Sequence, residues 1–524
     1  MSRHFNIAGP CNPDIHYMLS PLARIPKVMA LIEQQAYFVI HAPRQIGKTT
    51  VMMALAQELT ASGRYVGVLV SVEEADAFPN DIGAAEATIL RSWYENATDR
   101  LPPELAPTLA DRVEPGQGIR SALRSWAKTA SRPLVIFIDE IDTLKDQVLI
   151  SVLRQIRSGY ANRPRAFPHS LALIGLRDVR DYKVVSGGSD IRSSLQENHL
   201  TTASPFNIKA QSLSLRDFTV EEVTNLYHQH TEDTHQLFTD AATQRAFDLS
   251  QGQPWLVNAI AKIAVEELVI DRTMDITPDT IDRAKEILIQ RMDTHLDSLV
   301  ERLKEPRVRH VIEPILSGGS FSNIPEDDLR FVLDLGLVKR STTGGLEIAN
   351  PIYKEVLPRV LASNTQDSLP SIQPTWLTHA GELDIDALLE AFLDFWRQHG
   401  QPLLRSVAYH EIAPHIVLMA FLHRVANGGG RLEREYAIGT RRMDICLRYR
   451  SVTVGMELKV WRDAEKDPVD KGLVQLDRYL AGLGLDQGWL VIFDQRSGLP
   501  PIEDRTTTER RTTTSGRLVI VIRG

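Results

Sequence analysis

Residues 42–50, Ala-Pro-Arg-Gln-Ile-Gly-Lys-Thr-Thr, constrain the fold of this chain more than any other stretch. They follow the apolar run 37–40 and precede residues 51–59, whose apolar side chains recur at helical spacing. A strand, a tight loop and a helix in this order cradle phosphate groups, because the loop's backbone N–H groups point inward at the helix N-terminus. We therefore expect an α/β unit that binds a nucleotide.

The residues expected around the phosphates are Pro43, Arg44, Gln45, Ile46, Gly47, Lys48, Thr49 and Thr50. Lys48 is expected to reach the β- and γ-phosphates, and the Thr49 hydroxyl to complete the Mg²⁺ coordination. Ala42 stands where the pattern G-x-x-x-x-G-K-[ST] has its first glycine, and alanine is small enough for the turn. The alternative is a chance Gly-Lys-Thr in an ordinary loop between a strand and a helix.

Length and composition narrow the class of protein. A chain of 524 residues is too long for one hydrophobic core, so about three domains are expected. No apolar run approaches the roughly 20 residues of a membrane span, and the N-terminus lacks the apolar segment of a signal peptide. Cys11 and Cys446 are too few for a disulfide framework or a zinc site. We expect a cytoplasmic protein without membrane contact.

The first 213 residues alternate between strand and helix patterns. Further strands are expected at 65–70, 134–138, 171–174 and 208–213, and the run 134–138 is apolar throughout, as in strands buried on both faces. This alternation predicts a doubly wound parallel sheet that binds its ligand at the carboxyl ends of the strands.

Asp139 and Glu140 end the strand 134–138 and complete the expected nucleotide site. Asp139 is expected to hold Mg²⁺ through water, and Glu140 to orient and deprotonate the attacking water. Glu140 could instead be a solvated carboxylate at a helix start. Three arginines farther along, Arg177, Arg180 and Arg192, are candidates for sensing the γ-phosphate, but a surface salt bridge explains the first two equally well and none is assigned.

Apolar side chains recur at helical spacing in residues 214–304, and Gly252 and Pro254 mark a junction of two helices. We therefore expect a helical lid or a simple helix-turn-helix corner.

The sequence of residues 305–360 predicts two helices closed by a hairpin, which together would form a winged helix. Its second helix is acidic at Glu326, Asp327, Asp328 and Asp334, and phosphates would repel such a face. Docking of a partner protein is therefore favoured over DNA binding there.

Residues 361–404 read as a linker and a bracing helix, and residues 405–524 as a small mixed α/β domain. The charge is uneven: residues 401–524 carry a net +4, and residues 1–400 carry −12. An acidic N-terminal part and a mildly basic C-terminal part indicate different binding partners for the two parts of the chain.

A second chemical site is expected in the last domain. Asp444 begins one strand, and alternation places Glu457 and Lys459 on one face of the next. Two carboxylates near an ammonium are costly without a ligand, whereas with Mg²⁺ the carboxylates become metal ligands and the lysine can steady a hydroxide or a phosphate oxygen. Gln475 and Tyr479 share a face of the following helix. The alternative is an exposed, ion-paired strand edge.

These residues resemble the PD-(D/E)xK nuclease superfamily over about residues 405–524. The resemblance implies that Asp444 and Glu457 bind metal, Mg²⁺ or Mn²⁺, that Lys459 is catalytic, and that Gln475 and Tyr479 belong to the site. A glutamate of the first helix often joins them in that family, and Glu411 matches best, ahead of Glu433 and Glu435. Met443 stands in place of the family's proline.

Six arginines lie on the expected hairpin beside this site, where they would neutralise a phosphate backbone or form a solvated strand face: Arg431, Arg434, Arg441, Arg442, Arg448 and Arg450.

About residues 15–360 resemble the AAA-like P-loop ATPases related to the STAND class, on the phosphate loop, Asp139-Glu140, the Gln253-Pro-Trp lid and the winged helix. An ATPase fused to a nuclease is associated with defence against foreign DNA. The resulting hypothesis is an oligomeric protein in which ATP binding and slow hydrolysis license Mg²⁺-dependent cleavage of nucleic acid, with DNA preferred. The rival hypothesis is a nucleotide-dependent switch in which the domain of residues 405–524 binds nucleic acid or a partner protein without cleaving nucleic acid.

Overall fold

The computed structural model describes residues 3–108, 114–176, 208–292, 294–317, 324–341, 344–357, 374–406, 413–426, 430–438 and 441–524. The chain divides into two compact units. One comprises Met1–His295 with Leu329–Asn350, and the other comprises Leu296–Asp328 with Pro351–Gly524.

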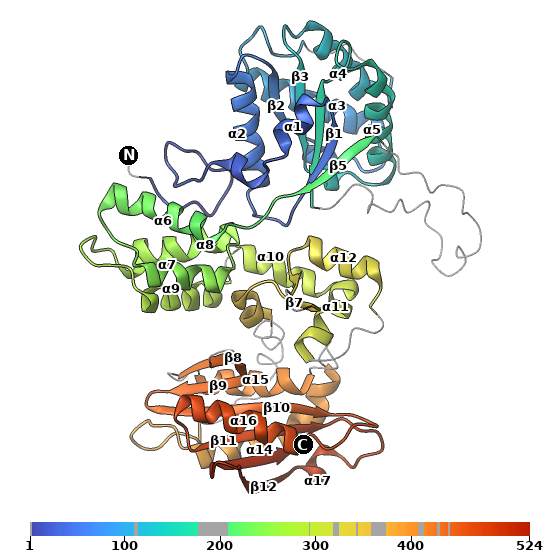
Figure 1. Ribbon diagram of the computed structural model, residues 1–524. Coiled ribbons are helices and arrows are strands. Elements are labelled where there is room, and N and C mark those ends of the chain that lie inside the picture. The colour runs from blue at the N-terminus through green and yellow to red at the C-terminus, as the bar shows by residue number, and fades with distance from the viewer. Residues whose placement is uncertain are drawn as a thin grey trace. The chain divides into compact units, whose positions relative to one another are not determined.

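The first unit is built on a five-stranded sheet with the order β2-β3-β4-β1-β5, in which every neighbouring pair is parallel (Figure 1). The parallel α/β sheet expected from the sequence is therefore confirmed. Its strands are β1 (Tyr37–His41), β2 (Val66–Ser71), β3 (Leu134–Asp139), β4 (Ser170–Gly175) and β5 (Lys209–Ser214).

Helices cover both faces of this sheet. Phe38 and Ile40 of β1 face one apolar cluster, which also contains side chains of the first two helices. Tyr37 and Val39 of the same strand face the other cluster, with side chains of the next three helices. Because successive side chains point to opposite faces and both faces are buried, the first four strands read as mainly apolar runs, whereas the edge strand β5 is mostly polar and only partly buried. The helices are α1 (Val28–Glu33), α2 (Lys48–Ala61), α3 (Ile82–Arg100), α4 (Gly118–Thr129) and α5 (Asp146–Gly159).

Four helices follow the sheet within the same unit. Thr219 and Glu222 form a reciprocal capping box that begins the first of them, as each side chain accepts a hydrogen bond from the other's backbone. Gly252 has a positive φ of 78° between two of the helices, and Pro254 takes the first turn of the next one. The four are α6 (Val220–Thr234), α7 (Asp240–Ser250), α8 (Pro254–Ile263) and α9 (Pro278–Arg291).

Three helices and a short antiparallel strand pair come next in the chain. The order of elements from residue 306 matches the expected two helices and hairpin, while their assembly as a winged helix stays a prediction. These elements are α10 (Thr294–Leu303), α11 (Pro306–Ser317), α12 (Glu326–Asp334), β6 (Val338–Arg340) and β7 (Leu346–Ile348).

The C-terminal part of the second unit contains a six-stranded sheet with the order β12-β13-β11-β10-β9-β8. Strands β10, β11 and β13 run parallel, and the remaining neighbouring pairs are antiparallel. The strands are β8 (Gly430–Ile438), β9 (Arg441–Tyr449), β10 (Val452–Trp461), β11 (Gln487–Asp494), β12 (Thr507–Thr512) and β13 (Leu518–Arg523). The helices are α14 (Ile385–Ser406), α15 (Ala413–Ala426), α16 (Val469–Leu483) and α17 (Ile502–Arg505).

The sequence predicted this order of elements but not β12. That strand reads Thr-Thr-Glu-Arg-Arg-Thr, and its side chains are mostly exposed at the edge of the sheet. A polar edge strand carries no apolar alternation to reveal it. Among the helices that the structure describes, none is long and apolar enough to cross a membrane.

Candidate functional site

The phosphate loop joins β1 to α2. Gly47 precedes the first residue of α2 with a φ of 90°, a left-handed conformation that glycine adopts without steric cost. Lys48 begins the helix, and its Nζ donates to the carbonyl oxygens of Ala42 at 2.8 Å and Pro43 at 2.9 Å. The loop therefore folds around the lysine ammonium, which phosphate oxygens can reach in place of these two carbonyls.

The carboxyl end of β3 meets the start of α2. Thr49 Oγ1 donates to Asp139 Oδ2 at 2.9 Å, and the backbone N–H of Glu140 donates to Asp139 Oδ1, also at 2.9 Å. Asp139 is buried. A hydroxyl and a carboxylate in direct contact are the oxygen ligands that Mg²⁺ prefers, so these two residues fit a metal. Sequence reasoning paired them, and the fold brings them together.

Burial sets the electrostatics of this site. It raises the pKa of the Asp139 carboxyl, although hydrogen bonds from Thr49 and Glu140 oppose the shift. Burial also raises the pKa of Glu140, with a further contribution from the neighbouring charges of Asp139 and Asp142. The pKa of Lys48 is lowered by burial, against the attraction of these carboxylates. The site thus concentrates negative charge that a bound cation would relieve.

Glu140 has a left-handed backbone with a φ of 57°. Such a conformation is strained for a residue other than glycine, and it often occurs at functional sites. Its carbonyl oxygen accepts a hydrogen bond from the Thr143 hydroxyl at 2.8 Å, which helps to hold the turn after β3. The three candidate sensors, Arg177, Arg180 and Arg192, lie outside the described residues.

A cavity of about 380 Å³ adjoins the phosphate loop. Gln45, Ile46, Gly47, Thr50 and Val51 line one side of it. The remaining lining comes from the N-terminal segment and the helical segment, and includes Ile7, Met18, Phe218, Leu226, Trp255 and Asn258. This volume lies within the range of about 300–1,000 Å³ found for small-ligand sites. The phosphate loop therefore borders a space with a largely apolar lining.

Sequence reasoning missed two supports of the loop. The buried Arg24 donates from Nη1 to the Ile46 carbonyl at 2.9 Å and from Nε to the Arg216 carbonyl at 3.0 Å. Burial lowers the pKa of Arg24 to about 10. The Cys11 N–H donates to Thr50 Oγ1 at 3.0 Å. No sequence signal marks either contact, because both depend on segments that only the fold brings together.

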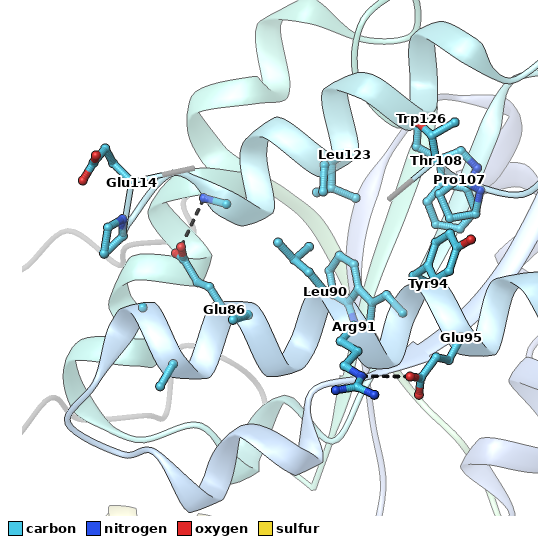
Figure 2. Close-up of a pocket in the computed structure, with 17 residues that line it drawn as sticks. Glu86, Leu90, Arg91, Tyr94, Glu95, Pro107, Thr108, Glu114, Leu123 and Trp126 are labelled. Carbon is cyan, nitrogen blue, oxygen red and sulfur yellow. Dashed lines mark hydrogen bonds and ion pairs between the residues drawn. The ribbon is translucent and has the colours of Figure 1, made fainter. Parts of the chain in front are cut away.

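A larger cavity, of about 1080 Å³, lies between α3 and α4 and has no lining residue from the phosphate loop (Figure 2). Glu86 borders it and accepts hydrogen bonds from the backbone N–H groups of Gly116 and Gly118, both at 3.1 Å. This carboxylate anchors the start of α4. Thr108 and Glu114, which also line the cavity, flank residues 109–113, outside the described part of the chain.

Strand β10 carries the second candidate site. The Glu457 side chain is 3% exposed, and Lys459 Nζ lies 2.5 Å from Glu457 Oε1. In the register with β11, Glu457 pairs with Leu490 and Lys459 pairs with Ile492. Leu490 and Ile492 both pack in the apolar cluster of α16. Because paired residues of neighbouring strands point to the same face of a sheet, the side chains opposite them on β10 share the face that α16 covers. This strand lies in the middle of the sheet, unlike the exposed strand edge of the alternative interpretation.

Gln475 and Tyr479 belong to α16 on that same side of the sheet. Tyr479 is buried in the apolar cluster that also contains Cys446 and Leu476. Gln475 is half-buried. The predicted apolar stripe of α16 packs inward: Leu476 and Leu480 are buried, and Leu473 and Leu483 are partly buried.

The antiparallel register of β9 and β10 pairs Ile445 with Met456, and the next residues along the two strands are Asp444 and Glu457. The two strands are therefore neighbours, as expected. The side chain of Asp444 and the whole of Glu411 lie outside the described part of the structure. Among the described residues, no group of three or more His, Cys, Asp or Glu side chains is placed to hold a metal.

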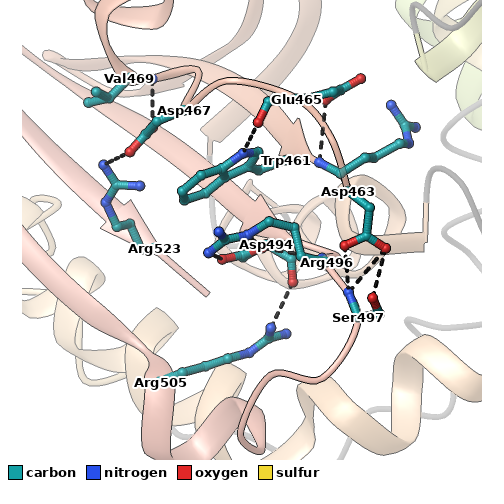
Figure 3. Close-up of polar contacts among 11 residues, drawn as sticks. Trp461, Asp463, Glu465, Asp467, Val469, Asp494, Arg496, Ser497, Arg505 and Arg523 are labelled. Carbon is teal, nitrogen blue, oxygen red and sulfur yellow. Dashed lines mark hydrogen bonds and ion pairs between the residues drawn. The ribbon is translucent and has the colours of Figure 1, made fainter.

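Polar contacts continue beyond Lys459 at the carboxyl end of β10 (Figure 3). The Arg496 guanidinium lies 3.5 Å from the centre of the Trp461 ring and is paired with Asp494 at 2.7 Å. Arg523 is paired with Asp467 at 2.9 Å. The Arg496–Trp461 contact joins the segment after β11 to the end of β10, and the Arg523–Asp467 pair joins the end of β13 to the segment before α16.

The side chains of four of the six predicted hairpin arginines, at 431, 434, 441 and 442, lie outside the description. Arg450, a fifth member of the set, donates to the Ala380 carbonyl at 3.2 Å. Arg448 is half-buried. A phosphate-binding role for this set stays a prediction.

The match to known families covers the first of these two sites. The chain belongs to the AAA-like domain family, whose model matches residues 24–355. The first unit therefore carries an α/β domain of the P-loop ATPase type. The match ends before the sheet β8–β13, and no curated protein matches the chain in sequence.

Three solved structures illustrate what this chain is similar to in its backbone path. The Walker-type ATPase PABY2304 of Pyrococcus abyssi is 12% identical with a TM-score of 0.45, covering 67% of this chain and 98% of its own. The RuvB Holliday junction branch migration motor of Thermotoga maritima is 17% identical with a TM-score of 0.34, and the match covers 63% of this chain and 90% of the RuvB chain. Cdc6p of Pyrobaculum aerophilum is 12% identical with a TM-score of 0.34, and the match covers 66% of this chain and 94% of the Cdc6p chain.

Proposed function

We propose that the chain binds and slowly hydrolyses ATP, and that its nucleotide state controls Mg²⁺-dependent phosphodiester cleavage by residues 405–524. The observation that carries the first half is the contact between Thr49 and Asp139, with Lys48 at the start of the same helix. The second half rests on the buried pair of Glu457 and Lys459. DNA is the preferred substrate.

At the ATP site, Lys48 exchanges its carbonyl partners for phosphate oxygens, and the N–H groups of the loop 43–50 bind the phosphates. Thr49 and Asp139 would hold Mg²⁺, and the charge neutralisation on the phosphates is the chemistry that this ion would supply. Glu140 accepts a proton from the attacking water. Its raised pKa suits that role, because a general base works best when its pKa approaches the working pH.

At the second site, Asp444 and Glu457 would hold Mg²⁺ or Mn²⁺, and the chemistry that this ion would supply is a lowered pKa of water and stabilised charge on the phosphate. Lys459 stabilises the nucleophile or a phosphate oxygen. The remaining proposed members of the catalytic site are Gln475, Tyr479 and Glu411. The near-complete burial of Glu457 supports this role, since an ordinary surface carboxylate would remain in water.

A cleavage assay tests both halves together. Plasmid DNA and a matched RNA are incubated with ATP and Mg²⁺ or Mn²⁺, using wild type, Lys48→Ala, Lys459→Ala and the exposed control Lys471→Ala. We expect cleavage by wild type and Lys471→Ala alone, and ATP hydrolysis by every protein except Lys48→Ala. Absence of cleavage under every nucleotide condition would refute the nuclease. Intact cleavage by Lys48→Ala would refute the coupling.

The proposed combination of an ATPase with a nuclease leads to a further part of the proposal, an oligomer that acts against foreign DNA. Wild type expressed in a bacterial host should lower phage plating, and Lys48→Ala and Lys459→Ala should restore it. Equal plating for all three proteins would remove the defence role from the proposal.

A second function, a nucleotide-dependent switch that binds nucleic acid or a partner without cleaving, is favoured by one observation. Tyr479 packs in an apolar cluster, which suits a structural role as well as a catalytic one. Binding of labelled DNA that changes with nucleotide, without cleavage by wild type, would select this function over the nuclease.

The acidic first turn of α12, with Glu326, Asp327 and Asp328, favours a protein partner over DNA at residues 305–360. Co-purification with and without these residues tests it. Unchanged partners after the deletion would exclude this docking role.

A further inference from the structure

The cavity beside the phosphate loop has two chemically different sides. The loop side offers backbone N–H groups to phosphates, whereas the far side is lined by apolar and aromatic side chains, among them Phe218, Leu226 and Trp255. A nucleotide has the same polarity, with charged phosphates at one end and a flat base at the other. The far side therefore matches the base in size and polarity.

Asn258 of α8 supplies a polar group to this far side. Its residue is 8% exposed, and its Nδ2 donates to the Pro254 carbonyl at 2.8 Å. A carbonyl oxygen can only accept, so the amide nitrogen must face Pro254 and the amide oxygen must be the other atom. This orientation does not depend on an arbitrary choice between two amide rotamers.

The oxygen of this amide has no partner: among the described residues, none donates a hydrogen bond to the buried Asn258 Oδ1. A buried acceptor without a donor is unfavourable, and a ligand that brings an N–H group relieves the cost.

Two side chains that line the cavity, Trp255 and Arg24, already donate their hydrogen bonds elsewhere. Trp255 Nε1 donates to the Ile7 carbonyl at 2.8 Å, and the Arg24 guanidinium donates to the carbonyls of Ile46 and Arg216. A base that presents a carbonyl oxygen at its edge therefore finds these donors occupied, and the hydrogen-bonding capacity that remains on Asn258 is that of an acceptor. A base that presents an amino group finds an acceptor.

We infer that Asn258 selects adenine by accepting a hydrogen bond from its exocyclic amino group, and so makes the site specific for adenine nucleotides. This inference rests on the proposed nucleotide site and assigns the residue that reads the base. Guanine and hypoxanthine carry a carbonyl oxygen where adenine carries the amine, and they bind more weakly.

The competing explanation gives Asn258 only a structural role, in which its amide holds the Pro254 carbonyl and supports α8. That role affects all nucleotides equally. A base-reading role affects only nucleotides that carry the amine, so the two explanations differ in a ratio of affinities and not in affinity alone.

Calorimetric titration of the full chain with Mg²⁺ and ADP, GDP or purine riboside diphosphate, which lacks the amine, tests the inference. Wild type should bind ADP roughly three- to tenfold more tightly than purine riboside diphosphate, the effect of one neutral hydrogen bond. Asn258→Leu should reduce this ratio to about one, whereas Asn225→Leu, on the exposed surface of α6, should keep it.

Equal binding of ADP and purine riboside diphosphate by wild type overturns the inference without any variant, so a misfolded Asn258→Leu protein does not leave it open. An unchanged ratio in a folded Asn258→Leu protein also overturns it. If wild type binds none of the three nucleotides, the proposed nucleotide site itself fails, and this inference fails with it.

Discussion

Replacing Asp139 by asparagine should separate stability from catalysis at the ATP site. The carboxylate accepts two hydrogen bonds of 2.9 Å, from Thr49 Oγ1 and from the Glu140 N–H. Asparagine can keep both, since its oxygen accepts from Glu140 and its amide nitrogen donates to the Thr49 hydroxyl, which can also accept. Alanine keeps neither.

The two lost hydrogen bonds set the expected magnitude. At roughly 1 kcal/mol each, Asp139→Ala should be about 2 kcal/mol less stable than Asp139→Asn. In a domain of about 150–250 residues this corresponds to a difference of roughly 4–8 °C in melting temperature.

Whether Asp139→Asn is more or less stable than wild type follows from the raised pKa of Asp139. A raised pKa means that the fold favours the protonated acid, so this group's contribution to stability is present at acid pH and is lost as the pH rises through the raised pKa. Asparagine resembles the protonated acid at every pH. Asp139→Asn should therefore match or exceed wild-type stability at about pH 8, and this advantage should shrink as the pH falls toward the ordinary aspartate range of about pH 4.

Thermal denaturation of the nucleotide-free proteins at both pH values measures these differences, with the exposed Asp99→Asn as the control for a charge change. Hydrolysis should fall by at least roughly 100-fold in both Asp139 variants, because neither supplies a carboxylate to the metal. The reasoning is refuted if Asp139→Asn melts below wild type at about pH 8, or if it still hydrolyses ATP.

Two further predictions concern the helical segment of the first unit. Gly252→Ala should destabilise it by roughly 2–4 kcal/mol in denaturant unfolding, because a Cβ atom would lie 2.0 Å from the Phe218 carbonyl oxygen and the backbone is left-handed there; wild-type stability would contradict this packing. Gln236→Leu should cost roughly 3 kcal/mol, since the buried amide donates to the carbonyls of Val269 and Met274 and accepts from Arg272. Hydrogen exchange of the segment after α8 should then accelerate, and unchanged protection would argue against the amide's role.

Several contacts were predictable because they depend on local periodicity. Alternation along a strand places residues two apart on one face, so the sequence predicted that Glu457 and Lys459 lie together, and their atoms are 2.5 Å apart. The pairing of Thr49 with Asp139 followed from two strand ends of one parallel sheet. Such rules need only the spacing of apolar and polar residues.

Other contacts carry no local signal. Arg24 binds the Ile46 and Arg216 carbonyls across separations of 22 and 192 residues, and nothing near Arg24 in sequence marks it. The edge strand β12 is polar, so its pairing depends on the neighbouring β13 and not on its own pattern.

By itself, the sequence determined the phosphate loop, the apolar strands and the helical segment, because backbone preference and burial leave a period in the chain. The tertiary structure alone decided what surrounds the loop: a cavity walled by the N-terminal segment and α8, and lined in part by Asn258, whose buried amide oxygen has no partner among the described residues. A side chain's unmet hydrogen-bonding capacity depends on its neighbours in space, which the linear order of residues does not state.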